Sequence, residues 1–310
     1  MSLDLSYGDE LLALQASVDG FCRRAGTGPG FCSSSPLPEG FWSGLADLGV
    51  LGLGTQSGGG GVLEIAAVME TLGAHGAPGP LVGTFAATAL LDDAVLGPVK
   101  SGDSLVSVGA EGVFPWAPVA DVFLELGVSE AWRVQPAGPV EPVDTTAGEP
   151  WARMAAERLE SLGDSSPAAA RASVAVAAYM VGAADELVSL SAEYARNRMQ
   201  FNKAIATFQA VSHPLASAAT RLNASRILVR GAAQRLDAGD TEAAQAAALA
   251  RLSATAAATD AAYRAHQLFG AMGFTLEGPV AFRSHRIRQV GLLAPSQGCV
   301  REVVAAGLGL

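Results

Sequence analysis

The alanine-rich second half of the chain, from Ser166 onward, constrains the fold more than any other feature. A proline directly after Ser166 is typical of a helix start, and apolar residues then recur at helical spacing over about thirty residues. A second helical stretch repeats an apolar residue every seven positions until Gly239. A third stretch ends at Phe269, and a short fourth stretch begins at Pro279. The third stretch is marked by Ala244, Leu249, Leu252, Ala256 and Tyr263. Long helices with alanine at the contact positions predict an antiparallel four-helix bundle over residues 164–310.

The first half of the chain changes pattern once. Residues 1–100 contain three helical stretches, near Gly8–Arg24, Pro36–Leu48 and Val62–Gly73. Residues 101–163 instead contain short alternating segments broken by Pro, Gly and Asp, which predict about five short strands. We therefore expect a mainly α protein with an N-terminal helical domain, a reduced β middle domain and the C-terminal bundle.

A run of four glycines, Gly58–Gly61, precedes the third of these N-terminal stretches. Such a run can cradle a phosphate when a strand precedes it and a P-loop lysine or a second spaced glycine pattern follows it. Neither is present, so the pattern favours a flexible elbow between helices.

Composition excludes several classes of protein. The chain is 50% apolar, which is enough to form a hydrophobic core. Its formal net charge is −10 and its pI is near 4.9, so its negative electrostatic field repels nucleic acid. The longest apolar stretch, Ala172–Ala184, is too short to span a membrane and predicts a buried helix. Early acidic residues, Asp4, Asp9 and Glu10, argue against a secretory leader, and a cytoplasmic location is expected.

The cysteines and histidines indicate no metal site. Cys22, Cys32 and Cys299 lack CxxC spacing, and the four histidines fall in separate segments without HExxH spacing. We expect reduced thiols. Cys299 could be a nucleophile, but no histidine lies beside it in the sequence, so a structural thiol is favoured.

The segment Tyr194–Gln209 is the most informative for function. It concentrates two arginines, a lysine and two phenylalanines at the junction of two long helices in an otherwise acidic chain. Arg198 can form a bidentate bond to a phosphate, worth about 1.5–3 kcal/mol, and the phenylalanines suit an aromatic group. The alternative is a basic helix end that only complements the helix dipole.

This segment resembles a motif of the acyl-CoA dehydrogenases. The family's first bundle-helix junction reads R-x-Q-F-G-x-x-I-x-x-F-Q; it is matched by Arg198, Gln200, Phe201, Ile205, Phe208 and Gln209, with Asn202 at the glycine. A second motif, Q-x-x-G-G-x-G-F-x-x-E, is matched by Gln267, Gly270, Gly273, Phe274 and Glu277, with Ala271 at the second glycine. The N-terminal part also resembles the family in its glycine elbow and in Glu70, Leu72, Gly73, Pro78 and Pro80.

The resemblance implies a fold of N-terminal helices, a β middle domain and a C-terminal four-helix bundle. It also implies FAD, which removes hydrogens from the α and β carbons of an acyl-CoA thioester, and an electron-transferring flavoprotein as electron acceptor. In such proteins the two bundle motifs reach across a subunit interface to the FAD held by the neighbour's middle domain. Carried over, Arg198 and Gln200 would bind the pyrophosphate, and Phe201 and Phe208 would pack near the adenine. The clamp would be completed by Gln209, Gln267 and Gly270.

Two parts of the family pattern are missing from this chain. The family's base is a glutamate placed either about twenty residues after the second motif, where this chain has Ala294, or near the start of the first bundle helix, where it has Ala172. Proton abstraction needs a carboxylate, which neither alanine supplies. Glu302 lies beyond the break at Pro295 and is not favoured. The flavin-platform motifs T-E-P and W-I-T are also absent from the middle domain.

We therefore expect the non-catalytic subunit of a heteromeric, α2β2 acyl-CoA dehydrogenase, similar to short subunits of steroid-degrading actinobacteria, whose partner supplies the flavin platform and the glutamate. A steroid-derived acyl-CoA is then a plausible substrate. Two alternatives stay open: a scaffold protein that retains the fold without turnover, and a homomeric enzyme that uses an unrecognised base such as Glu157 or Asp164.

Overall fold

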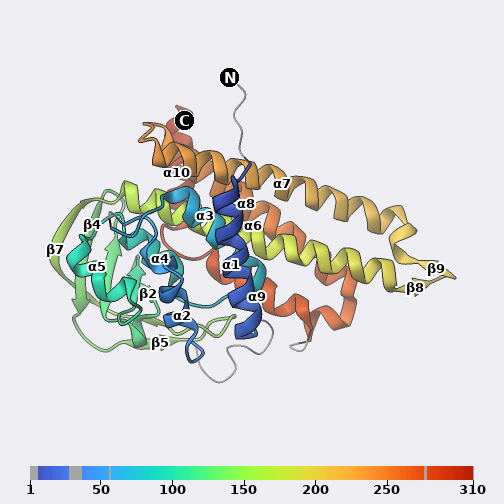
Figure 1. The fold of residues 1–310 in the computed structure, drawn as a ribbon, viewed down its shortest axis with the longest axis horizontal. Coiled ribbons are helices and arrows are strands. Elements are labelled where there is room, and N and C mark those ends of the chain that lie inside the picture. The colour runs from blue at the N-terminus through green and yellow to red at the C-terminus, as the bar shows by residue number, and fades with distance from the viewer. Residues whose placement is uncertain (1–5, 28–36, 56, 276–277, 310) are drawn as a thin grey trace.

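The computed structural model describes residues 6–27, 37–55, 57–275 and 278–309. It consists of N-terminal helices, a small β region and a long C-terminal helical bundle that extends away from the strands (Figure 1). The mainly helical fold class predicted from the sequence is confirmed. The N-terminal helices are α1 (Asp9–Ala25), α2 (Phe41–Asp47), α3 (Val62–His75), α4 (Leu81–Ala87) and α5 (Asp93–Lys100), with a 3-10 turn at Val50–Gly52.

The β region forms two small sheets. A four-stranded sheet has the order β1-β3-β4-β7, with β1 parallel to β3 and the other pairs antiparallel, and a three-stranded antiparallel sheet has the order β2-β6-β5. The strands are β1 (Val106–Gly109), β2 (Val113–Pro115), β3 (Val122–Leu126), β4 (Glu130–Pro136), β5 (Glu141–Val143), β6 (Trp151–Arg153) and β7 (Ala156–Asp164). The sequence did not indicate β2 and β6, because strands of three residues are too short to show alternation.

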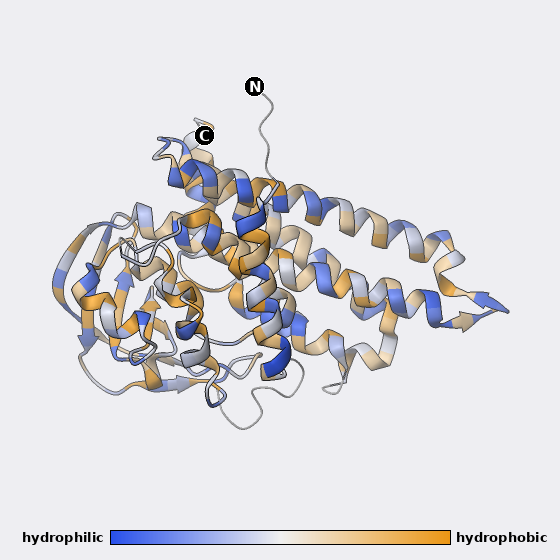
Figure 2. Cartoon of the chain, viewed as in Figure 1, coloured by the Kyte–Doolittle hydropathy of each residue, from blue (hydrophilic) through white to orange (hydrophobic). Residues whose placement is uncertain are grey.

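The C-terminal bundle contains α6 (Ser166–Asn197), α7 (Gln209–Asp237), α8 (Ala243–Phe269), α9 (Pro279–Val290) and α10 (Gln297–Gly307). The junction between α6 and α7 is a short hairpin of β8 (Met199–Gln200) and β9 (Lys203–Ala204), followed by a 3-10 turn at Ile205–Thr207. This hairpin is the tip of the bundle, at the opposite end of the molecule from the β region (Figure 1), and it carries both hydrophilic and hydrophobic residues (Figure 2).

Helix α6 is the central element of the core. It packs against α3, α4, α7, α8 and α9, and it approaches α3 so closely that both helices need glycine at the crossing. A Cβ at Gly182 would lie 1.8 Å from the Glu70 carbonyl oxygen, and one at Gly73 would lie 2.1 Å from that of Tyr179. By length and composition α6 could cross a membrane, but 78% of its most apolar window is buried inside the protein. It is the core helix that the sequence predicted.

Helix α8 lies where predicted, but a different face forms its buried side. Leu249 and Tyr263, which marked the helix in the sequence, are 40% and 64% exposed. The buried face is instead made of alanines, among them Ala250, Ala254, Ala258 and Ala261. Small side chains allow α6, α7 and α8 to approach closely, and Leu249 and Tyr263 are left on the outside, whereas Phe269 at the end of α8 is buried.

The glycine run Gly58–Gly61 forms a turn before α3, as expected. Its backbone lies close to the carboxylate of Asp237. Asp237, the last residue of α7, accepts hydrogen bonds from the backbone N–H groups of Val62 (2.7 Å) and Leu63 (3.0 Å). A Cβ at Gly61 would lie 2.3 Å from an Asp237 oxygen. The bundle therefore caps an N-terminal helix, which ties the two helical regions together.

Candidate functional site

The hairpin at the bundle tip carries the first motif. Gln200 pairs with Lys203 across the hairpin, so Phe201 and Asn202 are the two turn residues, with φ of 51° and 60°. Two-residue hairpin turns of this type require positive φ at both positions, which glycine and asparagine tolerate best. Asn202 can therefore replace the motif's glycine without changing the turn. Phe201 adopts the same disfavoured conformation and is 86% exposed.

An open groove of about 520 Å³ runs beside this hairpin. Gln200, Phe201 and Phe208 line it from the motif side, and Gln267 lines it from α8. The structure thus brings together residues of both motifs that are far apart in the sequence. The rings of Phe201 and Phe208 meet edge to face at 6.0 Å, and the Lys203 ammonium lies 4.3 Å from the Phe208 ring.

The remaining residues predicted for the site surround this groove without lining it. Arg198 follows α6 and is exposed, and its backbone is fixed by hydrogen bonds to Tyr194 (2.8 Å) and from Ile205 (2.9 Å). Gln209 is the exposed first residue of α7. Gly270 ends α8 with φ 59° and ψ −133°, a conformation open essentially only to glycine. Their side chains and backbone stay accessible to a ligand at the tip.

The sequence interpretation missed Arg264, which also lines the groove. It precedes Gln267 by three positions on α8, so both lie on one helix face, and this spacing could have identified it. Its guanidinium is paired with Asp260 at 3.3 Å. Arg264 therefore contributes a guanidinium from α8 to the lining of the groove, with its charge paired to Asp260.

The other end of the second motif forms an aromatic and basic cluster. The ring of His266 stacks on Phe274 at 4.8 Å, and Phe274 is 72% exposed. Burial lowers the pKa of His266 below its ordinary value, and the neighbouring side chains of His285 and Arg288 lower it further. The bundle tip thus combines exposed aromatic rings with a local excess of positive charge, which suits an anionic aromatic ligand.

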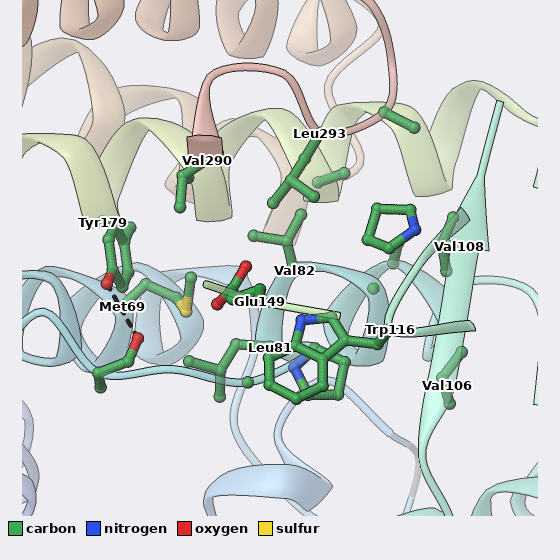
Figure 3. A pocket seen from close by; sticks show the side chains of 18 residues that line it. Met69, Leu81, Val82, Val106, Val108, Trp116, Glu149, Tyr179, Val290 and Leu293 are labelled. Atoms are coloured by element: carbon green, nitrogen blue, oxygen red, sulfur yellow. Dashed lines mark hydrogen bonds between the residues drawn. The ribbon is translucent and has the colours of Figure 1, made fainter. Parts of the chain in front are cut away.

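A second place of interest is a small cavity between α3, α4, β1 and α6 (Figure 3). Ala172 and Ala294, the two positions at which the family's glutamate is expected, both line it. Its volume is about 30 Å³, room for one or two water molecules. Trp116, which is 2% exposed, Val82 and neighbouring apolar side chains fill the rest of the space.

Glu149 is the carboxylate among the described residues that line this cavity. It lies among apolar side chains (Figure 3) and is 7% exposed. Arg286 donates to one of its oxygens, and Gln289 donates to the other at 2.9 Å. Gln289 also accepts from the backbone N–H of Ala147 at 2.7 Å. No motif in the sequence marks this cluster. Each oxygen of Glu149 therefore accepts one hydrogen bond, and these two bonds hold the carboxylate against α9.

The alternative bases considered from the sequence lie elsewhere. Glu157, on β7, accepts a hydrogen bond from Gln135 at 2.8 Å on the exposed side of the sheet. Asp164 accepts from the backbone N–H of Ser166 at 2.9 Å, at the start of α6. Glu302 is exposed on α10. The structure therefore brings none of these three carboxylates to the cavity that Ala172 and Ala294 line.

A slot of about 410 Å³ separates the β region from the starts of α6, α8 and α10. Glu111 and Glu125 line it, and the described lining residues include no cation. A pyrophosphate needs cations or oriented donors, so this slot does not match the phosphate portion of a dinucleotide.

The thiols fit structural roles. Cys299 lines the same slot, half-buried, and no histidine is among the described residues around it. Burial raises the pKa of the Cys22 thiol to about 12, which makes it inert. Cys32 and Glu277 lie outside the described residues. Among the residues that are described, no cluster of potential metal ligands occurs.

The class of protein follows from the helical layers, the small β region and the groove lined by residues of both motifs. These are the features of an acyl-CoA dehydrogenase fold. A family model described as "Acyl-CoA dehydrogenase, C-terminal domain" matches residues 168–305. The acyl-CoA dehydrogenase IpdE2 of Mycobacterium tuberculosis is 31% identical over 228 residues, which cover 71% of this chain and 69% of that protein. The chain belongs to the acyl-CoA dehydrogenase family.

Two solved structures share the complete fold. One is the ChsE4-ChsE5 complex of Mycobacterium tuberculosis, with a TM-score of 0.83, 22% identity and coverage of 99% of both chains. The other is a variant of the Tcur3481-Tcur3483 steroid ACAD, with a TM-score of 0.80, 20% identity and coverage of 98% of this chain and 99% of that one. At these identities the likeness shows the fold alone.

Proposed function

We propose that this chain is the non-catalytic subunit of a heteromeric, FAD-dependent acyl-CoA dehydrogenase. The observation that carries the proposal is the cavity at Ala172 and Ala294. Both base positions hold alanine, the space between them is about 30 Å³, and the nearby carboxylate, Glu149, is bound by Arg286 and Gln289. A pocket for a substrate of this class needs several hundred Å³. The cavity between the two base positions is therefore too small to hold an acyl chain.

The bundle tip is the part of the chain suited to FAD. When bound, FAD accepts the hydride that leaves the substrate's β carbon. Arg198 and Gln200 would hold the pyrophosphate of the partner's FAD, and Phe201 and Phe208 would pack against its adenine. Gln209, Gln267 and Gly270 complete the clamp. The rings of Phe201 and Phe208 lie beside Lys203 and Arg264. Rings next to cations suit the adenine and the negatively charged phosphates of a dinucleotide.

The position of the tip supports action in trans. It lies at the far end of the bundle from the chain's own β region (Figure 1), and the slot beside that region carries Glu111 and Glu125. The partner subunit supplies the flavin platform and the proton acceptor, and two copies of each make the α2β2 assembly.

The substrate of the complex is a large acyl-CoA, with a steroid-derived acyl group as the leading candidate. Support comes from the solved neighbours, one a two-component complex and the other described as a steroid ACAD. An electron-transferring flavoprotein is the proposed electron acceptor.

The test is to purify the full chain alone and together with candidate partners, and to measure bound flavin by absorbance. We expect flavin and acyl-CoA dehydrogenation only in the mixture. Arg198→Ala should then strip flavin from the complex, whereas Arg196→Ala, an exposed arginine on the last turn of α6, should not.

Other outcomes would support the alternatives. Flavin and turnover in the chain alone would establish a homomeric enzyme, and Glu149 would then be the first residue to replace. A partner complex that holds neither flavin nor activity would establish a scaffold. Unchanged flavin content in Arg198→Ala would refute the clamp assignment.

A further inference from the structure

Arg264 is the cation among the described residues that line the groove at the bundle tip. The rest of that lining consists of apolar side chains and two glutamines, Gln200 and Gln267. Arg198, to which the family motif assigns the pyrophosphate, lies beside the groove without lining it. A dinucleotide in this groove would therefore bring its phosphates to a wall whose charged group is Arg264.

Asp260 holds the guanidinium of Arg264 by one edge. Its Oδ1 lies 3.3 Å from Nε of Arg264, which follows it by one turn of α8. The two terminal nitrogens of Arg264 have no partner among the described residues, and the side chain is 35% exposed, so a ligand can reach it. These two nitrogens form the edge of a guanidinium that can donate to two oxygens of one phosphate.

A second arginine offsets the charge of Asp260. Nη1 of Arg221, on α7, lies 3.4 Å from Oδ2 of Asp260. One carboxylate is therefore shared between two guanidinium groups, and the cluster of Arg221, Asp260 and Arg264 keeps an excess of positive charge. This excess lies at the groove of a chain whose formal net charge is −10, so it favours an anion at this place on an otherwise acidic protein.

We propose that Arg264 donates to a phosphate of the flavin dinucleotide, and that Asp260 is a positioning residue that holds the guanidinium in place for it. This inference rests on the proposed function, because the dinucleotide is the partner's FAD. An unrestrained arginine loses rotamer freedom when it binds a phosphate, whereas a side chain already held by Asp260 loses less. Arg221 reduces the repulsion between the Asp260 carboxylate and the phosphate.

The dissociation constant of FAD in the reconstituted complex, measured by flavin fluorescence, tests the role of Arg264. Arg264→Ala should raise this constant on the order of 10- to 100-fold, because a charge-assisted bond to a phosphate is lost. Arg235→Ala is the matched control. Arg235 also pairs with carboxylates, those of Asp240 and Glu242, but it lies in the last turn of α7, away from the groove. Its removal should leave the constant unchanged.

Two variants of Asp260 separate positioning from charge. Asp260→Asn keeps an acceptor for Nε of Arg264, so the affinity for FAD should be retained within about twofold. Asp260→Ala removes the acceptor, and the dissociation constant should rise about three- to tenfold. If Asp260 acted through its charge alone, both variants would bind FAD more tightly than the wild type, because a negative charge near the phosphates would be gone. Circular dichroism should show every variant folded.

Full FAD affinity in Arg264→Ala, or tighter binding by both Asp260 variants, would overturn this inference. The proposed function would still stand if Arg198→Ala stripped the flavin from the same complex. A complex that holds no flavin would overturn the proposed function and this inference with it.

Discussion

Glu149 and Arg286, which are 137 residues apart in the chain, form a buried ion pair at the edge of the cavity that Ala172 and Ala294 line. Arg286 is 1% and Glu149 7% exposed. The pair connects the segment before β6 to α9, and Gln289 adds a second link to the same segment. The chain therefore fixes its middle region against its bundle at the place where a catalytic family member would hold substrate.

Removal of one partner of this pair should destabilise the fold. Glu149→Gln leaves the Arg286 charge buried without its counter-ion, and we expect a loss of about 3–5 kcal/mol in the free energy of unfolding. Urea denaturation measures this loss. Glu157→Gln, a matched change on the exposed side of β7, should cost less than about 0.5 kcal/mol. Equal losses in the two variants would show that the buried pair has no special role.

The crossing of α3 and α6 should not tolerate a methyl group. Gly182→Ala would place its Cβ 1.8 Å from the Glu70 carbonyl oxygen, so the helices must separate, at a cost of about 1–3 kcal/mol or more. Gly231→Ala, on α7, meets nothing within 4 Å and should stabilise the chain by about 0.5–1 kcal/mol, because alanine favours helix. Thermal unfolding should therefore show a lower melting temperature for Gly182→Ala and a higher one for Gly231→Ala than for the wild type. A stable Gly182→Ala chain would mean that the helices are less tightly packed than described.

Replacement of Phe201 by asparagine should raise the stability of the chain and lower flavin binding by the complex. It is an exposed aromatic residue at φ 51°, so Phe201→Asn should stabilise the isolated chain by about 0.5–1 kcal/mol, because asparagine tolerates this conformation. The same variant should lower the flavin content of the assembled complex, since the ring that packs on the adenine is gone. Val128→Asn, also at an exposed apolar turn position, is the control and should leave flavin content unchanged. Full flavin retention in Phe201→Asn would exclude a role for this ring.

The stability of the chain should fall as the pH drops through the range in which histidine titrates. Burial holds the pKa of His266 below the ordinary value of about 6.5 for a histidine. As the pH falls through about 6.5, the unfolded chain therefore binds a proton more readily than the folded one, and folding becomes less favourable. His266→Gln should show a smaller loss of stability between pH 7 and about 5 than the wild type does. Urea denaturation across this range measures it, with His213→Gln, an exposed histidine on α7, as the control. Parallel curves for wild type and His266→Gln would contradict the prediction.

The sequence alone determined the helical bundle, the small β region and the two separated motifs, because these depend on residues close together in the chain. Helical periodicity, proline starts and glycine stops are local signals, and so is the pattern that surrounds Arg198. The alanines at positions 172 and 294, where the resemblance to the family places a glutamate, were also evident before the structure was known.

Only the tertiary structure decided which residues meet. It placed Gln200 and Phe208 in one groove with Arg264 and Gln267, and it brought Glu149 to Arg286 across 137 residues of sequence. It also turned the alanines of α8 inward and left Leu249 and Tyr263 outside. Local pattern could not reveal these relationships, because contact between distant segments depends on how closely helices can approach, and alanine and glycine at the crossings set that distance.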